Sequence, residues 1–218
     1  NADVGTHTIT VTCTDGAGAT ASDAYVLTVT NTNDAPTISS TAVTAATEDA
    51  AYTYTVVAAD VDSGDTVTLS GTTVPSWLTF TAATGVLTGT PTNAEVGSHA
   101  VVITATDVSG ATATDTFTVV VANTNDAPTL ASAITDVTHA EDAAYSLSVS
   151  GMCTDVDAGD TMDYTISGAP STITISGTTI SGTPVNADVG THTITVTCTD
   201  GADATASDAY VLTVTNVN

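Results

Sequence analysis

A long internal repeat restricts the possible fold of this chain more than any other feature of its sequence. Residues 186–218 match residues 1–33 at 31 of 33 positions, at a spacing of 185 residues. A weaker copy begins at Asn93, and the segment NTNDAPT at 31–37 recurs 92 residues later at 123–129. A fixed period of 92–93 residues is typical of array architectures, so the sequence predicts tandem modules of one fold.

The phase of the repeat sets the module boundaries. Residues 34–125 and 126–218 each contain one full period, so we expect two complete modules. Residues 1–33 match only the second half of a module, and so short a piece cannot bury a core by itself. The missing half comes either from a longer polypeptide of which this chain is a window, which we favour, or from a neighbouring chain.

The charge of the chain excludes several classes of partner. The 218 residues include 24 Asp and Glu but no Lys or Arg, which gives a formal net charge of −24 at pH 7. Nucleic acids and anionic membranes are bound through cations that neutralise phosphate, so we predict no nucleic-acid partner. No run approaches the ~18 apolar residues of a membrane-spanning helix, so we expect no membrane insertion. The carboxylates must be solvated or paired through bound cations.

Strand-forming residues dominate the composition. The chain has 51 Thr but only three Glu and no Gln, and the branched Thr side chain suits strands, so we expect very little helix. Short segments of the middle module alternate apolar and polar residues between turns. These segments are 51–58, 65–70, 77–80, 85–89, 99–106 and 114–122, with a further strand within 37–44. About seven short strands per module predict an all-β fold of antiparallel β-sandwiches, with 1–33 as the C-terminal part of one.

The cysteines vary as a pair. Cys153 and Cys198 of the last module are both replaced in the middle module, by Ala58 and Ala105. Joint replacement is what a disulfide would produce, and the predicted strands place these residues as in immunoglobulin-type sandwiches. We therefore predict a Cys153–Cys198 disulfide and an extracytoplasmic setting, with small buried thiols as the alternative. Cys13 matches Cys198, so its partner would lie in the missing half-module.

Residues 76–121 carry a recognisable family pattern. They contain a run of the form L-x-F-x-x-x-T-G-x-L-x-G-T-P, followed by V-G and T-D-x-x-G, which residues 173–205 keep in shortened form. This pattern resembles the "putative Ig" repeats of bacterial and archaeal extracellular surface proteins, also described as dystroglycan-type cadherin-like repeats. The resemblance implies tandem cadherin-like (Ig-like) sandwiches in a linear array. Some members of this family bind calcium.

Acidic motifs recur at equivalent places in each module. They are an Asn-x-Asn-Asp linker, a Glu-Asp pair before the second strand, an Asp-x-Asp-x-Gly-Asp turn after it, and the Asp of a Thr-Asp turn. By resemblance to cadherin junctions, we assign these groups to two Ca²⁺ sites. The first contains Asp15, Asn33, Asp34, Glu48, Asp60 and Asp62, and the second contains Asp107, Asn125, Asp126, Glu141, Asp155 and Asp157.

Turn formation is the competing interpretation of these motifs, because Asp and Asn occupy turns for backbone reasons. The net charge favours cations, since clustered carboxylates repel one another and no Lys or Arg offsets that repulsion. The sequence also departs from true cadherins, because its linker reads NTNDAP and the cadherin D-R-E triplet requires Arg.

The remaining candidates favour structural roles. His7, His99 and His192 share one repeat position, and the single Trp77 is replaced by Thr172 in the sister module. We find no unrepeated polar cluster, so we predict no catalytic residue and no enzyme.

The sequence therefore predicts a structural segment of a long extracellular or cell-surface protein, such as an adhesin shaft, a stalk or a filament. Calcium at the junctions would stiffen it. Its partners would be adjacent modules of the same array and, through exposed edge strands, further copies in a filament. The alternative is a ligand- or glycan-binding accessory module of a secreted protein; the repeated loops and few aromatic residues favour the shaft.

Overall fold

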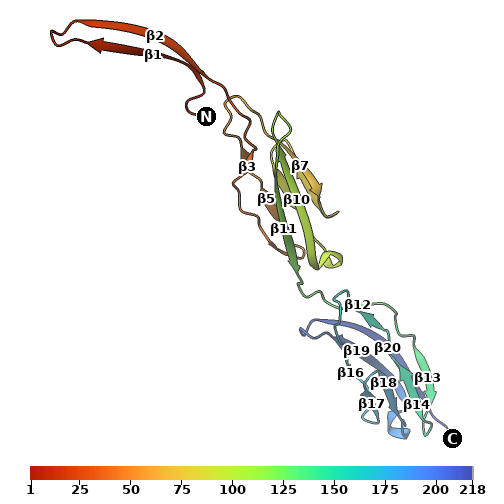
Figure 1. The fold of residues 1–218 in the computed structure, drawn as a ribbon. Coiled ribbons are helices and arrows are strands. Elements are labelled where there is room, and N and C mark those ends of the chain that lie inside the picture. The colour runs from red at the N-terminus through yellow and green to blue at the C-terminus, as the bar shows by residue number, and fades with distance from the viewer. Residues whose placement is uncertain (218) are drawn as a thin grey trace. The chain divides into compact units, whose positions relative to one another are not determined.

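The computed structural model describes residues 1–217 and consists almost entirely of strands (Figure 1). The chain divides into two compact units, Asn1–Ala122 and Asn123–Asn218. The helical elements within the described residues are two single 3₁₀ turns, η1 (Asn93–Glu95) and η2 (Asn186–Asp188). The predicted all-β fold of tandem Ig-like, cadherin-like domains is confirmed.

The second unit is a complete β-sandwich. Its larger sheet has the strand order β13-β20-β19-β16, and its smaller sheet the order β14-β18-β17, with a separate β12–β15 pair. The bounds are β12 Thr129–Leu130, β13 Val137–Ala140, β14 Tyr145–Ser148, β15 Cys153–Thr154, β16 Asp163–Ser167, β17 Ile173–Ser176, β18 Thr179–Gly182, β19 Gly190–Thr199 and β20 Thr205–Thr215.

Alternation along the two long strands builds the core of this unit. In β19, every second residue points inward, and Ile194, Val196 and Cys198 are fully buried while the intervening Thr side chains face outward. The facing sheet and its loops contribute Tyr145, Met152, Cys153, Ile173 and Ile180. The disulfide between Cys153 and Cys198 lies within this core, with a Cα–Cα distance of 6.6 Å, so the predicted pairing is confirmed.

The middle module repeats this arrangement in the first unit. Its sheets have the orders β4-β11-β10-β7 and β5-β9-β8, with a β3–β6 pair. The bounds are β3 Thr37–Ile38, β4 Ala45–Thr47, β5 Tyr52–Thr55, β6 Ala58–Ala59, β7 Thr68–Thr73, β8 Leu78–Thr81, β9 Val86–Gly89, β10 Gly97–Thr106 and β11 Thr112–Ala122. Its core is purely non-covalent and is centred on Tyr54, Leu87, Ile103, Phe117 and Val119.

One predicted strand of the middle module is divided between two sheets. The segment 51–58 forms β5, which pairs with β9, and then β6, which pairs with β3. The segment 37–44 contains only β3, and the chain then continues into β4 beside β11. Because the chain crosses from one sheet edge to another, β4 runs parallel to β11, as β13 runs parallel to β20, in an otherwise antiparallel sandwich.

The first 33 residues contribute one hairpin, β1 (Gly5–Thr14) and β2 (Thr20–Val29). Its register pairs Gly5 with Val29 and Thr14 with Thr20, which matches the register of β19 and β20 residue for residue. Within the described residues this hairpin is a two-stranded sheet without a covering layer (Figure 1).

The glycine of the Gly-Thr-Pro motif has a packing role. A Cβ atom built on Gly182 would lie 1.9 Å from the carbonyl oxygen of Thr172, and one on Gly89 would lie 2.2 Å from that of Trp77. Both glycines pair within the smaller sheet, so the family pattern keeps a position where two backbones approach too closely for any side chain.

We expect the disulfide to stabilise the second unit alone. Closing a loop of 45 residues contributes about 4 kcal/mol in the chain-entropy treatment. Reduction should therefore lower the melting temperature of the second unit by more than ~10 °C in calorimetry. The middle module, with Ala58 and Ala105 at the equivalent positions, is the internal control; an equal shift of both transitions would contradict this assignment.

Candidate metal centres

The linker entering the middle module is tied to that module by acidic side chains. The side-chain amide of Asn33 donates to Oδ2 of Asp107 at 2.8 Å and to the carbonyl oxygen of Asp34 at 3.0 Å. The backbone amide of Asp34 donates to Oδ2 of Asp62 at 2.8 Å. Asp62 and Asp107 are both buried, so the linker is fixed by acceptors that are themselves held in the module.

Asp60, Asp62 and Asp65 form a compact turn beside this linker. The amide of Asp62 donates to Oδ1 of Asp60 at 2.8 Å, and the amide of Asp65 donates to the carbonyl oxygen of Asp62 at 3.1 Å. One oxygen from each carboxylate lies within 4.8 Å of the others. Oδ2 of Asp60 is buried and has no hydrogen-bond partner among residues 1–217. A buried carboxylate oxygen of this kind is satisfied by a hydrogen-bond donor or a cation.

Electrostatics in this group reflect crowding of negative charge. Burial, together with the charges of Asp107, Asp60 and Asp62, raises the pKa of Asp65. The side-chain amide of Asn33 lowers the pKa of Asp107 against the effect of burial, with help from backbone amides of the following turn. A bound cation would favour the ionised form of such a carboxylate, because a nearby opposite charge lowers its pKa.

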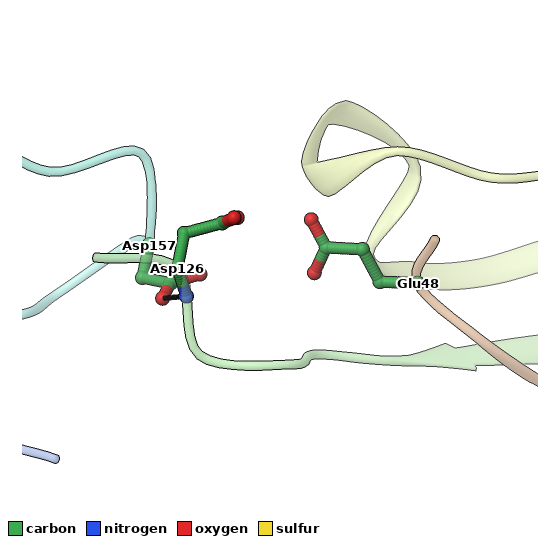
Figure 2. A group of neighbouring side chains, drawn as sticks. All are labelled: Glu48, Asp126 and Asp157. Atoms are coloured by element: carbon green, nitrogen blue, oxygen red, sulfur yellow. Dashed lines mark hydrogen bonds between the residues drawn. The ribbon is translucent and has the colours of Figure 1, made fainter. Parts of the chain in front are cut away.

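The second unit builds the same arrangement from equivalent residues. Asn125 donates to Oδ2 of Asp200 and to the carbonyl oxygen of Asp126, both at 2.9 Å. The amide of Asp126 donates to Oδ2 of Asp157 at 2.8 Å, the dashed line in Figure 2. The amide of Asp157 in turn donates to Oδ1 of Asp155 at 2.8 Å. Two modules with different surrounding sequence thus form one and the same acidic linker site.

Its charges behave in the same way. Oxygens of Asp155, Asp157 and Asp160 lie within 4.8 Å of one another, and Oδ2 of Asp155 is buried without a partner among the described residues. Burial and the charges of Asp155, Asp200 and Asp157 raise the pKa of Asp160. The side-chain amide of Asn125 lowers the pKa of Asp200.

These donor sets suit a hard cation. Each group brings together the carboxylate oxygens of three Asp residues, without His nitrogen or Cys sulfur, and such oxygen donors are preferred by Ca²⁺ and Mg²⁺ over zinc or copper. The partnerless oxygens of Asp60 and Asp155 give each group a ligand atom that no protein donor satisfies. The acidic clusters can therefore hold a metal ion.

The Glu of each Glu-Asp pair lies at the other end of its own module. The amide of Glu48 donates to the carbonyl oxygen of Ala122, and that of Glu141 to Thr215, both at 3.0 Å. Oε1 of Glu141 also accepts the amide of Val217 at 2.9 Å, while its Oε2 is buried without a partner among residues 1–217. Both Glu side chains are buried at the end where the chain leaves the module.

The observed grouping therefore differs from the predicted one for Asp107, Glu48 and Glu141. Asp107 bonds to Asn33 of the first group, and its equivalent, Asp200, bonds to Asn125 of the second. Glu48 and Glu141 lie at the ends of β11 and β20 instead of at the linkers that enter their modules. The reason is strand direction: β10 and β19 run toward the entering linker, whereas β4 and β13 run parallel to the strands that leave.

Asp15 is also separated from the group to which it was assigned. Its Oδ1 accepts the amides of Ala17 and Ala19 at 2.9 and 2.8 Å, so it caps the β1–β2 turn. The ten-residue strand β2, about 33 Å long, separates this turn from Asn33. Asn33, Asp34, Asp60 and Asp62 do lie together, as do Asn125, Asp126, Asp155 and Asp157. Asp65, Asp160 and Asp200 belong to these groups although the predicted ligand sets omitted them.

The weaker candidates have structural surroundings. Nε2 of His99 lies 2.6 Å from the carbonyl oxygen of Glu95, and His192 makes the equivalent contact with Asp188 at 2.7 Å. Trp77 packs edge-on against Tyr52 and His99, with ring centroids 5.7 and 5.8 Å apart.

Proteins with similar sequences include bacterial adhesins. The chain is 35% identical over 164 residues to the "Serine-rich adhesin for platelets" of Staphylococcus aureus strain MSSA476, covering 73% of this chain and 7% of that protein. The homologue from strain MRSA252 is also 35% identical over 164 residues, covering 73% of this chain and 12% of its own length. The chain thus spans a small part of these relatives. Its location is extracellular or at the cell surface. Within residues 1–217 we find no helix of the length and hydropathy needed to cross a membrane.

Known structures with a similar fold include cadherin ectodomains. Cadherin domains 1–5 of protocadherin gamma B2 superpose with a TM-score of 0.65 at 18% identity, covering 99% of this chain and 47% of that one. Mouse cadherin-23 EC22-24 superposes with a TM-score of 0.61 at 16% identity, covering 97% and 74%. The family described as "Putative Ig domain" matches residues 35–122 and again residues 127–215. The chain belongs to this family of bacterial surface repeats.

Proposed function

We propose that this chain is part of the shaft of a long surface adhesin, in which repeated sandwiches separate an adhesive region from the cell. Adhesin relatives and tandem Ig-like modules support this role. The acidic groups also favour it, because each recurs in both modules at the point where a linker enters. A shaft would repeat the same acidic group at every junction, whereas a single ligand-binding site would require such a group only once.

We further propose that calcium occupies these groups. The observation that carries this proposal is the buried, partnerless carboxylate oxygen of Asp60, reproduced by Asp155 in the next module. A buried ionised oxygen without a donor is costly, and its recurrence in both modules indicates a use. Ca²⁺ takes six to eight oxygen ligands at about 2.3–2.6 Å, which turns rich in Asp can supply.

The proposed ligands follow the observed grouping. Asp60, Asp62 and Asp65 would hold the ion in the middle module, with Asn33, Asp34 and Asp107 fixing the linker around it. Asp155, Asp157 and Asp160 would do the same in the last module, with Asn125, Asp126 and Asp200.

Calcium at these positions would stiffen the array. Only residues 123–125 separate Ala122, whose carbonyl anchors Glu48, from Asp126, and an extended chain spans at most ~3.6 Å per residue. We propose that Glu48, at the exit end of its module, supplies a further oxygen to a junction calcium, and that Glu141 has the same role in its own module.

The alternative role, a ligand- or glycan-binding accessory module, has less support. The one Trp of the chain packs within its module against Tyr52 and His99 instead of forming an open aromatic platform. We infer that the chain has no catalytic activity of its own, and we retain the dystroglycan-type subgroup as a proposal. Adjacent modules remain the proposed partners, and lateral filament formation through edge strands a further proposal.

Calcium should raise the melting temperature of both units. With a dissociation constant of about 0.5 mM, about 5 mM calcium adds ~1.4 kcal/mol per site, or about 6–10 °C for a module of this size. Calorimetry with calcium and with chelator at equal ionic strength measures this rise. A shift no larger than that given by magnesium or sodium chloride would reject specific calcium sites.

Substitution of one ligand should remove the response of one module. Asp155→Asn should abolish the calcium-dependent rise of the second unit and leave that of the middle module intact. Asp203→Asn is the matched control: it removes the same charge from an exposed turn residue outside the cluster, at a positive φ of 69° that Asn also adopts. If the two variants respond alike to calcium, the effect is general screening by salt.

Stiffening should appear in the dimensions of the chain in solution. Small-angle scattering should give a narrower distribution of interatomic distances with calcium than with chelator, because bound ions restrict the linker. Glu48→Gln should reduce this difference without changing the melting temperature of the middle module in chelator. An unchanged distribution in the wild type would mean that calcium binds, if at all, without joining the modules.

A further inference from the structure

One hairpin sequence occurs in this chain in two different environments. β1–β2 and β19–β20 belong to segments that differ only at Gly18/Asp203 and Thr32/Val217, and neither difference falls within a strand. In the second unit the inward-facing residues Ile194, Val196 and Tyr210 are at most 1% exposed. The equivalent Val11 and Tyr25 are 60% and 52% exposed. The difference lies in what covers the face.

The second unit displays the covering layer of this hairpin in full. β13 pairs with β20 along one edge and β16 pairs with β19 along the other. The sheet β14-β18-β17 closes the face, where the hydroxyl of Tyr145 meets that of Tyr210 at 3.0 Å and Cys153 bonds to Cys198. All five strands and Cys153 come from residues 126–185, directly before the hairpin.

The first hairpin lacks these contacts within the described residues but retains every group that makes them. Its apolar face, with Val11, Cys13, Tyr25 and Leu27, is exposed, and a shallow hollow on it is lined by Val11, Cys13, Ala21 and Tyr25 together with the polar Ser22 and Asp23. Both outer edges present unpaired strand backbone, and Cys13 is a free thiol. This hairpin therefore offers what a half-sandwich binds in the second unit: an apolar face to cover, two strand edges to pair with and a thiol to bond to.

We propose that the exposed face of β1–β2 is the docking surface for a half-module with the sequence character of residues 126–185. Docking closes a third sandwich. Cys13 then forms a disulfide with the residue equivalent to Cys153, and the two electrons and two protons of the thiols reduce an extracellular small-molecule disulfide to two thiols. Tyr25 takes the place of Tyr210 in the buried hydroxyl pair.

A second copy of this chain is a poorer occupant of the same face. Its own 126–185 half is already closed by its 186–218 hairpin, and displacing that hairpin would expose as much apolar surface as it covers. Two β1–β2 hairpins meeting face to face would bury apolar residues but would leave all four outer edges unpaired. Only a half-module of the 126–185 type satisfies the face, both edges and the thiol together.

The test extends the full chain instead of cutting it. A copy of residues 126–185 is fused directly before Asn1, so that its last residue meets Asn1 as Val185 meets Asn186. The extended chain contains four cysteines, and we expect no free thiol after oxidative folding, against one in the original chain. Peptide mapping should find both Cys13 and Cys198 bonded to peptides with the Cys153 sequence, which the copy shares. Hydrogen exchange of β1–β2 amides should slow at least ~10-fold.

Matched variants separate docking from disulfide formation. In the extended chain, Cys13→Ala should keep the slowed exchange, because the face and edges still dock. Val11→Asp should abolish it, since the equivalent Val196 is fully buried, whereas Thr8→Asp should not, since the equivalent Thr193 faces solvent. A free Cys13 with unchanged exchange in the extended chain would overturn the proposal. So would a dimer of the original chain, seen by sedimentation, in which β1–β2 amides are already protected.

Discussion

Every carboxylate in this protein is held without a Lys or Arg partner, and this constraint organises the rest of the structure. Backbone amides and Asn side chains take the place of cationic side chains. Asp15, Asp107 and Asp200 each accept amides of the turn that follows them. Glu95 and Asp188 accept the amides of Thr92 and Val185 at the two 3₁₀ turns, which lowers the pKa of both carboxyls. Negative charge is thus used as a hydrogen-bond acceptor at the turns that follow β1, β10 and β19 and at both 3₁₀ turns.

This use of charge gives each module two different ends. At the entry end, the Asp-x-Asp turn and the Thr-Asp turn meet the linker, and the pKa of Asp65 or Asp160 rises because burial and like charges act together. At the exit end, a buried Glu is fixed by the backbone of the last strand. Hydrogen-bond donors from the protein satisfy most of these oxygens but leave one at each turn without a partner. Fixed backbone geometry therefore concentrates unmet negative charge at the junctions.

The sequence predicted the fold because period-two alternation, turn residues and the repeat all favour the same sandwich. It also predicted the disulfide, since the paired replacement of Cys153 and Cys198 is visible without coordinates. The grouping of acidic residues was less predictable, because it depends on strand direction and not on motif order. Asp107 is 74 residues from Asn33 in the chain yet is bonded to it, and Glu48 is closer in sequence but lies at the other end. The crossing of the chain from β3 to β4 decides this, and no single residue signals it.

The two copies of the hairpin show which properties are local and which depend on a partner. Register and turn geometry are the same in both, so they follow from alternation and from the Asp that caps the turn. Burial differs, because the core forms between the hairpin and the half-module before it. Each complete period therefore closes its hydrophobic core on itself. In such an array the cores set the stability of each module, and the stiffness of the whole can be adjusted only at the linkers. That is where this sequence, which has no cationic side chain to neutralise its carboxylates, places its buried negative charge.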